Sequence, residues 1–390
     1  MQEGEMSNPF TRSQVVLVLF YVSVFLMVFF LTSHQLSGNH YQSDLRSHIF
    51  FVEKIFNGEV YIPHPLWHLS VHYMKYITLS EKCAASLVSA GFVLLWVYIV
   101  QNVYTFLAGK ERNTIYTFLF LSIIFVIGPA YIPSFSKYII TGTGSPNIWH
   151  NITLFAVKPF ALLALFFTVL GLEKQKFSYY AVGFVSLLAS IFAKPSFVIA
   201  FLPALALFIL VKKIYSKENL VYFMILSLMS VGVLGYQFTH TYGGEGNGAI
   251  IIDVLGVWSR YTPNVLVSII LALMFPLVYF VTNIKHVLRN NYIILTWFIT
   301  FISIVYAAVF AESGPRYNHG NFFWSYMISL SLLYVFTIAD YFKYYGSINR
   351  VVKIGLNLIL VWQVLVGLYC FVRVMQGYDA SGLFEIPAFF

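Results

Sequence analysis

The sequence predicts an all-α integral membrane protein, a polytopic helical bundle of about eleven transmembrane helices. Of its 390 residues, 59% are hydrophobic and only 10% are charged, whereas soluble domains carry about 25% charged residues. Apolar runs recur along the whole chain, and about 20 helical residues suffice to cross a hydrocarbon core of about 30 Å. These runs lack the alternation of barrel strands, and backbone groups in lipid must be satisfied within their own segment, so we expect helices.

The hydrophobic runs place these helices in one transmembrane domain, residues 1–390. The expected spans are 14–34, 83–107, 114–134, 152–172, 178–193, 196–211, 219–238, 263–283, 291–310, 321–339 and 351–374. The motif FAKP at 192–195 leaves open whether 178–211 forms two short spans or one kinked helix. We expect two spans, because one helix would break the charge alternation described next.

Basic residues lie on alternate connections between the spans, which predicts the orientation of the chain. They are Lys110, Arg112, Lys174, Lys176, Lys212, Lys213, Lys217, Lys285, Arg289, Lys343, Arg350 and Lys353. With Arg12 they make thirteen of the 23 Lys and Arg residues, and all thirteen share one side if the N-terminus is cytoplasmic. We therefore expect an N-in, C-out topology. Because the basic residues are scattered singly, cytoplasmic loops explain the net charge of +8, and no nucleic-acid partner is expected.

This topology gathers the unusual polar residues on the extracytoplasmic face. The expected loops there are 35–82, 132–151, 239–262 and 311–321. In the first loop, Ser43–Ile55 (SDLRSHIFFVEKI) has apolar residues at helical spacing and is expected to lie along the membrane interface. Nine of the ten histidines fall on this face or at its edge, His286 being the exception. A functional site is therefore expected on this side.

Asp44 and His48 are the first candidate catalytic residues. They are four residues apart, so a helix would place both on one face. A carboxylate at the membrane surface suits a general base, and a neighbouring histidine can orient it or share its proton. The alternative is an ordinary solvated carboxylate in a loop.

The histidines of PHPLWH (63–68) are candidate substrate-binding residues. His64, His68 and His72 have the i, i+4, i+8 spacing of a metal-binding helix face. The prolines at 63 and 65 predict, however, that the helix begins near Leu66, which leaves His64 off that face. We therefore assign no metal ligand and expect His64 and His68 to contact substrate or neighbouring polar groups, while a divalent cation as cofactor remains open.

A third set of candidates surrounds the start of the span at 152. Asn147, His150 and Asn151 belong to the motif SPNIWHN, and Lys158 follows two turns into the span. A lysine at that depth is costly in lipid unless it is paired or faces a wet cavity, the alternative being that it extends toward the interface. Lys194 in FAKPS raises the same question. If the two lysines converge, they form a binding site for an anionic group.

The segment ESGPRYNHGN (312–321) carries the last candidates. Glu312, Arg316 and His319 lie in a short turn between two hydrophobic spans. They offer a carboxylate for catalysis, a bidentate phosphate binder and a titratable donor for substrate. The alternative is a self-satisfied ion pair that caps the helix ends.

An N-in bundle of about eleven helices, with the acidic Asp44 of SDLRSH in an interfacial helix of its long first external loop, resembles the GT-C superfamily of membrane glycosyltransferases. That superfamily uses polyprenyl-phosphate-linked sugars. The resemblance covers most of the chain in topology but rests on one short motif. It implies that Asp44 is the general base and that the partners are a polyprenyl-phosphate-linked sugar, membrane lipid and a glycan or lipid-linked acceptor. The loop lacks a paired Asp-Asp or Glu-Asp motif and the chain lacks a C-terminal soluble domain, which leaves metal dependence and subfamily open.

The expected chemistry is sugar transfer at the extracytoplasmic face of a bacterial inner membrane, with the active site toward the periplasm. The donor phosphate would lie beside Arg316, Lys158 or Lys194, which stabilise its charge as it leaves, while a carboxylate takes the proton of the acceptor hydroxyl. Two alternatives remain. An O-antigen-type polymerase or ligase usually relies on arginines in large external loops, which are few here, and a transporter would place polar residues in helices broken at mid-membrane.

Overall fold

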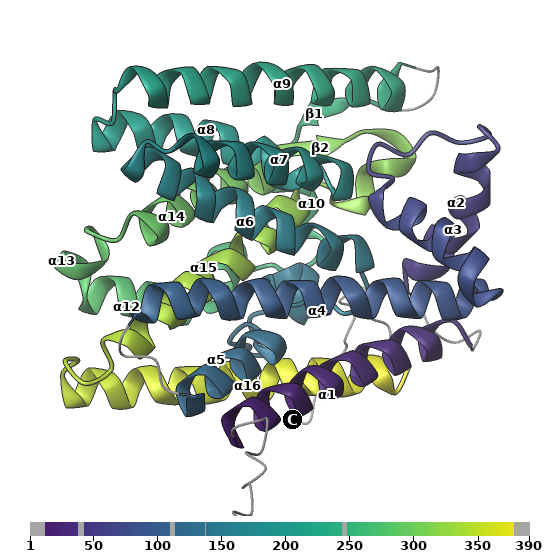
Figure 1. The fold of residues 1–390 in the computed structure, drawn as a ribbon. Helices are drawn as coiled ribbons and strands as arrows, with labels where there is room; N and C mark the ends of the chain where they lie inside the picture. Colours follow the sequence, from purple (N-terminus) through teal and green to yellow (C-terminus); the bar gives the residue numbers. More distant parts are fainter. Residues whose placement is uncertain (1–11, 38–42, 110–113, 137, 244–247, 378–390) are drawn as a thin grey trace, which may run out of the picture.

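The computed structural model describes residues 12–37, 43–109, 114–136, 138–243 and 248–377, and Figure 1 shows that this part of the chain is predominantly helical. Every hydrophobic segment expected from the sequence contains helix. The corresponding helices are α1 (Arg12–Gln35), α4 (Glu81–Ala108), α5 (Thr114–Val126), α6 (Ile152–Lys174), α7 (Phe177–Ala193), α8 (Ser196–Lys212), α9 (Lys217–Tyr242), α11 (Val265–Ala272), α12 (Met274–Thr282), α14 (Asn291–Val309), α15 (Phe323–Lys343) and α16 (Arg350–Met375). The all-α prediction is confirmed.

Fewer of these helices qualify as membrane spans than the sequence predicted. Among the described residues, seven helices are long and apolar enough to cross a membrane, namely α1, α4, α6, α9, α14, α15 and α16. The pair α11 and α12, bent by 70°, makes an eighth if it is one span. The helices α5, α7 and α8 are apolar but shorter. Eleven spans therefore remain a prediction, whereas the membrane helical bundle itself is established.

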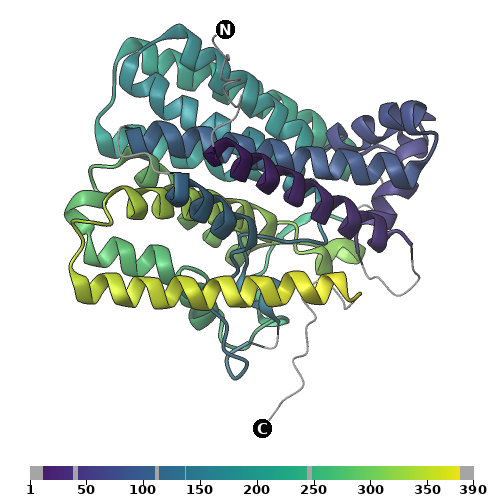
Figure 2. The ribbon, with the colours of Figure 1, turned by 60° about the horizontal axis from the view of Figure 1, so that its bottom comes forward.

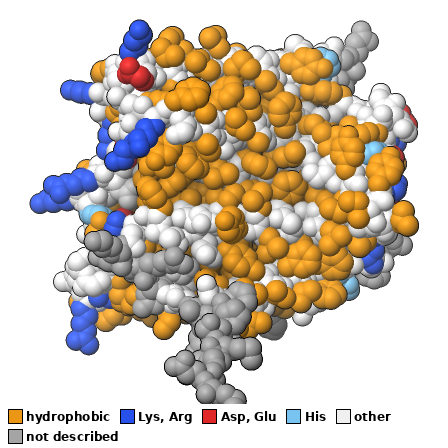
Figure 3. All heavy atoms as spheres, viewed as in Figure 1, with side chains coloured by type: hydrophobic (Ala, Val, Ile, Leu, Met, Phe, Trp, Pro, Cys, Tyr) orange, Lys and Arg blue, Asp and Glu red, His pale blue; other side chains and the backbone are white. Residues whose placement is uncertain are grey.

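The surface agrees with a membrane location. Figure 3 shows apolar side chains across the middle of the visible face, with Lys and Arg side chains projecting from the left end. Leu228 and Val231 on α9, and Leu358 and Leu365 on α16, are 60% or more exposed. Exposed apolar side chains of this kind are costly in water and stable in lipid, which together with the long apolar helices indicates an integral membrane protein. The pair Lys110 and Arg112 lies outside the described residues.

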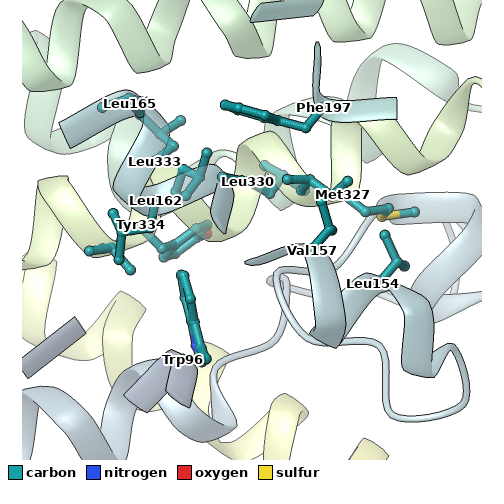
Figure 4. Packing of buried hydrophobic residues seen from close by; sticks show 14 of the residues in the cluster. Trp96, Leu154, Val157, Leu162, Leu165, Phe197, Met327, Leu330, Leu333 and Tyr334 are labelled. Atoms are coloured by element: carbon teal, nitrogen blue, oxygen red, sulfur yellow. The ribbon is translucent and has the colours of Figure 1, made fainter. Parts of the chain in front are cut away.

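The centre of the bundle is α15, which is buried over nearly its whole length. It packs against α4, α6, α8 and α14, and Figure 4 shows Leu330, Leu333 and Tyr334 of α15 among residues of these neighbours, including Trp96 and Phe197. Because α15 is surrounded by protein, it can carry polar side chains that lipid would not tolerate. The helices α1 and α16 lie toward the outside of the bundle (Figure 2).

Helix α5 ends at Val126, eight residues before the predicted end of its span at 134. Pro129 disfavours a helical conformation at Gly128, and the chain continues without helix from Ile127. The amide of Asn147 donates hydrogen bonds of 3.0 and 3.1 Å to the carbonyl oxygens of Ile124 and Ile127. The free end of the helix is therefore satisfied inside the protein.

Helices α7 and α8 are two helices and not one kinked helix. Helix α7 starts three residues after the end of α6, and Lys212 at the end of α8 donates a hydrogen bond of 2.9 Å to the carbonyl of Leu288 beside α13 (Ile284–Val287). Both outer ends thus lie at the basic end of the molecule, and the turn between them, at Lys194 and Pro195, points to the other end (Figure 1).

That other end carries the short elements of the predicted external loops. They are α2 (Leu45–Phe56), α3 (Leu66–Thr78), π-helix η2 (Ile139–Thr143), β1 (Ile250–Ile252), α10 (Gly256–Ser259), β2 (Phe310–Glu312) and the 3₁₀ helix η3 (Gly314–His319). Helix α2 confirms the helix predicted within 43–55, and α3 begins at Leu66 as predicted. Strands β1 and β2 pair antiparallel with Ile250 opposite Glu312, a contact that the sequence did not predict.

Candidate functional site

Asp44 is joined to the start of α6 and to the turn between α7 and α8. It is the N-terminal cap residue of α2, and its Oδ2 accepts a hydrogen bond of 2.9 Å from the amide of Asn151. Asn151 in turn caps α6, because its Oδ1 accepts from the backbone N–H of Leu154 at 3.2 Å and from the hydroxyl of Thr153 at 2.8 Å. The ammonium of Lys194 donates to Thr153 at 2.9 Å. Two predicted loops and the FAKP turn therefore meet at Asp44.

Lys194 connects this group to the last predicted loop. Its side chain is only 7% exposed, and its ammonium lies 5.3 Å from the ring centroid of Trp324, within cation–π distance. Within the described parts of the chain no carboxylate lies within 4 Å of it, and Asp44 is the acidic group whose charge acts on it. The indole of Trp324 donates at 3.3 Å to the side-chain oxygen of Asn321. A continuous set of polar contacts thus runs from Asp44 toward 311–321.

Glu312 lies at the far end of this set of contacts, and both oxygens of its carboxylate have hydrogen-bond partners. Its side chain is 3% exposed, and its two oxygens accept hydrogen bonds from the hydroxyl of Tyr242 and the amide of Asn321. The guanidinium of Arg316 lies 3.6 Å from the same carboxylate and 5.5 Å from the ring centroid of Tyr242. Glu312 therefore holds β2 against the end of α9, which resembles the capping alternative more than a free acid or base. The side chain of His319 lies outside the described residues.

Three histidines pack beside Asp44 and Lys194. Nδ1 of His48 and Nε2 of His68 are 3.0 Å apart, and the ring centroid of His64 lies 6.4 and 6.3 Å from theirs. Burial lowers the pKa of His48 and His64 well below its usual value and lowers the pKa of His68 to about 4, and the positive charge of Lys194 acts in the same direction. The histidines are therefore neutral near pH 7. Within the described parts of the chain, no group of three or more His, Cys, Asp or Glu residues is arranged to hold a metal ion.

These neutral histidines predict that the fold loses stability in mild acid. Because their pKa is lowered in the folded protein, the unfolded chain binds more protons below pH 6.5, and stability decreases as the pH falls from 6.5 toward 4. For His68 the loss reaches about 3 kcal/mol at pH 4. Thermal unfolding in detergent between pH 7.5 and 4.5 measures this loss of stability. The triple variant His48→Gln, His64→Gln, His68→Gln should lose less stability in acid than the exposed control His240→Gln; equal losses would contradict the prediction.

Lys158 and Asn147 lie in a different environment, and the two lysines do not share a partner. The ammonium of Lys158 donates to the carbonyl of Pro146 at 2.7 Å and to the side-chain oxygen of Asn147 at 2.9 Å, and it lies 4.4 Å from the ring centroid of Phe155. Lys158 is 2% exposed and Asn147 5% exposed. Their polar atoms satisfy one another and the end of α5. This geometry favours a structural role over the predicted binding of an anion.

His150 lies between these two groups of contacts. It is 3% exposed, and its backbone carbonyl accepts a hydrogen bond of 3.3 Å from Ser43, the residue before Asp44. The motif SPNIWHN therefore divides in two: its end belongs to the site around Asp44, and its beginning supports α5. Several site residues were not predicted, namely Thr153, Trp324, Tyr242 and Asn321, since no local pattern shows that their segments meet.

An apolar groove adjoins the polar site. Its volume is about 370 Å³. Its walls come from the segment before α3, the end of α7 and the middle of α9, and the lining residues are Tyr61, Ile62, Pro63, Pro65, Phe192, Gly232, Val233, Tyr236 and Gln237. The two prolines flank His64, and Phe192 lies two residues before Lys194. The groove is therefore lined by close chain neighbours of His64 and Lys194.

The sequence matches no protein-family model and no curated protein. The function is therefore inferred from the geometry of this site.

Proposed function

We propose that the protein is a membrane glycosyltransferase that moves a sugar from a polyprenyl-phosphate or pyrophosphate donor to a cell-envelope glycan or lipid-linked acceptor. One observation carries the proposal. The charge of Asp44 acts on the buried Lys194, chain neighbours of Lys194 and His64 line an apolar groove, and within the described residues only one of the two carboxylate oxygens of Asp44 has a hydrogen-bond partner. Sugar transfer from a lipid phosphate requires a base for the acceptor, a cation for the phosphate and an apolar groove for the lipid tail.

Each group has a role that follows from its contacts. Asn151 holds one oxygen of Asp44, so the other is free to accept the proton of the acceptor hydroxyl. As the bond between the anomeric carbon and the phosphate oxygen breaks, negative charge grows on the phosphate. Lys194 is fixed in place by Thr153 and Trp324 and stabilises that charge without reorganising. Arg316 is one-third exposed and supplies a second cation nearby.

The proposal includes the orientation of the chain. The basic ends of α6, α8 and α16 lie together at one end of the bundle, and the site lies at the other. The positive-inside rule places the basic end in the cytoplasm and the site on the extracytoplasmic face. For a bacterial inner membrane this face is the periplasmic one. A donor lipid in the outer leaflet then reaches the groove sideways from the bilayer.

The groove offers a matched pair of variants. Gly232 lines the groove, Gly235 does not, and at both positions an added Cβ meets nothing within 4 Å. We expect Gly232→Leu to fill part of the groove and raise the KM for a lipid-linked donor about tenfold or more, because a lipid tail that competes with a leucine side chain loses at least about 1.4 kcal/mol of burial. Gly235→Leu should change KM less than twofold. Equal effects of the two variants on the KM for the donor would contradict the role of the groove in donor binding.

The proposal itself is tested with purified protein in lipid nanodiscs, a panel of radiolabelled polyprenyl-phosphate and polyprenyl-pyrophosphate sugars, and cell-envelope glycan acceptors. Transfer of a single sugar supports a glycosyltransferase. Long products made from lipid-linked oligosaccharides would indicate the polymerase or ligase alternative. Absence of transfer with every donor and acceptor would contradict the proposal.

One observation favours a transporter as the second candidate, namely the 70° bend between α11 and α12. Broken helices are typical of transport sites. Here, however, the carbonyl of Ala272 accepts from the hydroxyl of Tyr334 at 2.8 Å, and that of Leu271 accepts from the N–H of Ala130 at 3.2 Å. The segment 265–282 contains no charged residue. Protein groups thus satisfy the break. The buried carboxylate beside it, Asp340, accepts hydrogen bonds from Tyr279 of α12 and from Asn290 and lies 2.9 Å from Nε2 of His286, so it too is engaged by protein.

A further inference from the structure

His64 occupies a position that the proposed chemistry leaves unused. Its Nδ1 is buried and has no hydrogen-bond partner within the described residues. Titratable or charged groups from four elements act on its ring: Lys194 from the turn between α7 and α8, Arg316 from η3, His48 from α2 and His68 from α3. Its chain neighbours, Pro63 and Pro65, line the apolar groove. A buried polar atom without a partner, on which two cations act and whose chain neighbours line an apolar groove, fits an anionic group that completes its hydrogen bonding.

The charged groups that act on the ring of His64 are Lys194 and Arg316, and Arg316 lies 3.6 Å from the carboxylate of Glu312. The three histidines are neutral because burial and the nearby cations hold their pKa below its usual value. A bound phosphodiester adds one negative charge beside these groups. That charge would favour the protonated form of the nearest imidazole, so a proton would be taken up together with the lipid.

We propose that His64 recognises the phosphoryl group of the donor and takes up one proton when the lipid phosphate binds. This inference rests on the proposed function, because it concerns the same donor site. The proton comes from solvent and joins a ring nitrogen of His64, which makes both ring nitrogens donors. The imidazolium then donates a charge-assisted hydrogen bond to a phosphoryl oxygen, and no covalent bond forms or breaks. The ligand class is a lipid phosphate whose binding is tighter at lower pH.

The test measures binding and proton uptake without sugar transfer. The probe is farnesyl methyl phosphate, a diester whose single charge does not titrate near neutral pH. Calorimetry of the full-length protein in nanodiscs, at pH 7 in buffers of different ionisation enthalpy, should show uptake of about one proton per bound lipid. The dissociation constant should rise up to about tenfold per pH unit between pH 7 and 8. Dimethyl phosphate, which has the same charge but no tail, should bind at least about tenfold more weakly than the lipid, and farnesol should bind with no uptake of protons.

His64→Gln keeps a polar side chain but cannot take up the proton. We expect it to lose the proton uptake and the pH dependence and to bind the probe about tenfold more weakly, with farnesol binding unchanged as evidence of an intact groove. The matched control is His72→Gln, because His72 pairs with Tyr76, stacks on Phe56 and lies 3.8 Å from the carboxylate of Glu53; it should bind like the wild type.

Three outcomes would overturn the inference. Binding without proton uptake in the wild type would contradict it, and so would uptake that persists in His64→Gln, which would assign the proton to His48 or His68. Equal binding of dimethyl phosphate and the lipid would show a site for free phosphate instead. A different result would contradict the proposed function alone. In that case the wild type would bind the lipid with proton uptake but transfer no sugar from any donor.

Discussion

Asp44→Asn is expected to lower kcat for sugar transfer by about 10³-fold, while the protein still folds. A positioned general base contributes about 10²- to 10⁴-fold to a proton transfer, and asparagine keeps the size of the side chain but cannot accept the proton. The contact with Asn151 can persist, because an asparagine oxygen accepts the same hydrogen bond. Donor binding should change much less than kcat. The measurement is steady-state transfer with the best donor of the panel.

Two further acidic residues serve as controls for this result. Glu53 lies on the same helix as Asp44 but forms an exposed ion pair of 2.9 Å with Lys75, so Glu53→Gln should change transfer less than about threefold. Glu312→Gln should mainly lower thermal stability, because both oxygens of Glu312 are engaged by Tyr242 and Asn321. Transfer that survives in Asp44→Asn and disappears in Glu312→Gln would move the base to the last loop.

Lys194→Met should have the second-largest effect, a decrease of kcat/KM by about 10³-fold, or about 4 kcal/mol of transition-state stabilisation. Methionine keeps an unbranched apolar side chain as far as Cε but removes the ammonium charge that stabilises the leaving phosphate. The effect should exceed that of Thr153→Val, which removes the hydrogen-bond acceptor of the ammonium but leaves the charge in place. Transfer kinetics on size-selected, folded protein measure both variants.

The chain provides a second buried lysine as a matched control. Lys158→Met removes the same charge from a site whose contacts are neutral oxygens and an aromatic ring. We expect it to change kcat/KM of the folded fraction less than about fivefold and to change mainly thermal stability, since the amide of Asn147 also supports the end of α5. Loss of transfer in both variants alike would restore the sequence-based expectation that both lysines bind the anion.

The helices were predictable because each depends on its own apolar run. The start of α3 was also predictable, since Pro63 and Pro65 permit a helix only from about Leu66. The end of α5 was not, because an apolar run does not show where a helix stops when Asn147, distant in sequence, replaces its hydrogen bonds. The predicted number of spans is not confirmed for a related reason: α7 and α8 are apolar enough but short, and protein covers much of their surfaces.

The candidate site was also predictable only where its features are local in sequence. Asp44 and His48 were selected by their spacing of four residues, and Glu312 by its place in a short turn between two apolar spans; both features can be read from the sequence. Whether a carboxylate keeps an oxygen without a hydrogen-bond partner depends on residues distant in sequence. Tyr242 and Asn321 donate to both oxygens of Glu312, and only the fold brings them there. Lys158 and Lys194 could not be told apart from the sequence, because their partners are also set by the fold. Lys194 faces the site because a helix turn places it beside Thr153.

The interrupted end of α5 bears on how the protein is made. The N–H of Gly128 donates at 3.1 Å to the carbonyl of Gln363 in α16, and Gly128 and Gly367 approach so closely that a Cβ on either would clash with backbone. The N–H of Ala130 depends on α11 in the same way. A ribosome releases these donors long before either partner exists, and an unsatisfied N–H in hydrocarbon costs several kcal/mol. The segment after α5 must therefore stay in the insertion machinery or in water until the last helix enters. Asn147 and the motif that carries it are thus ordered late, and the binding end of the protein matures only once biosynthesis is complete.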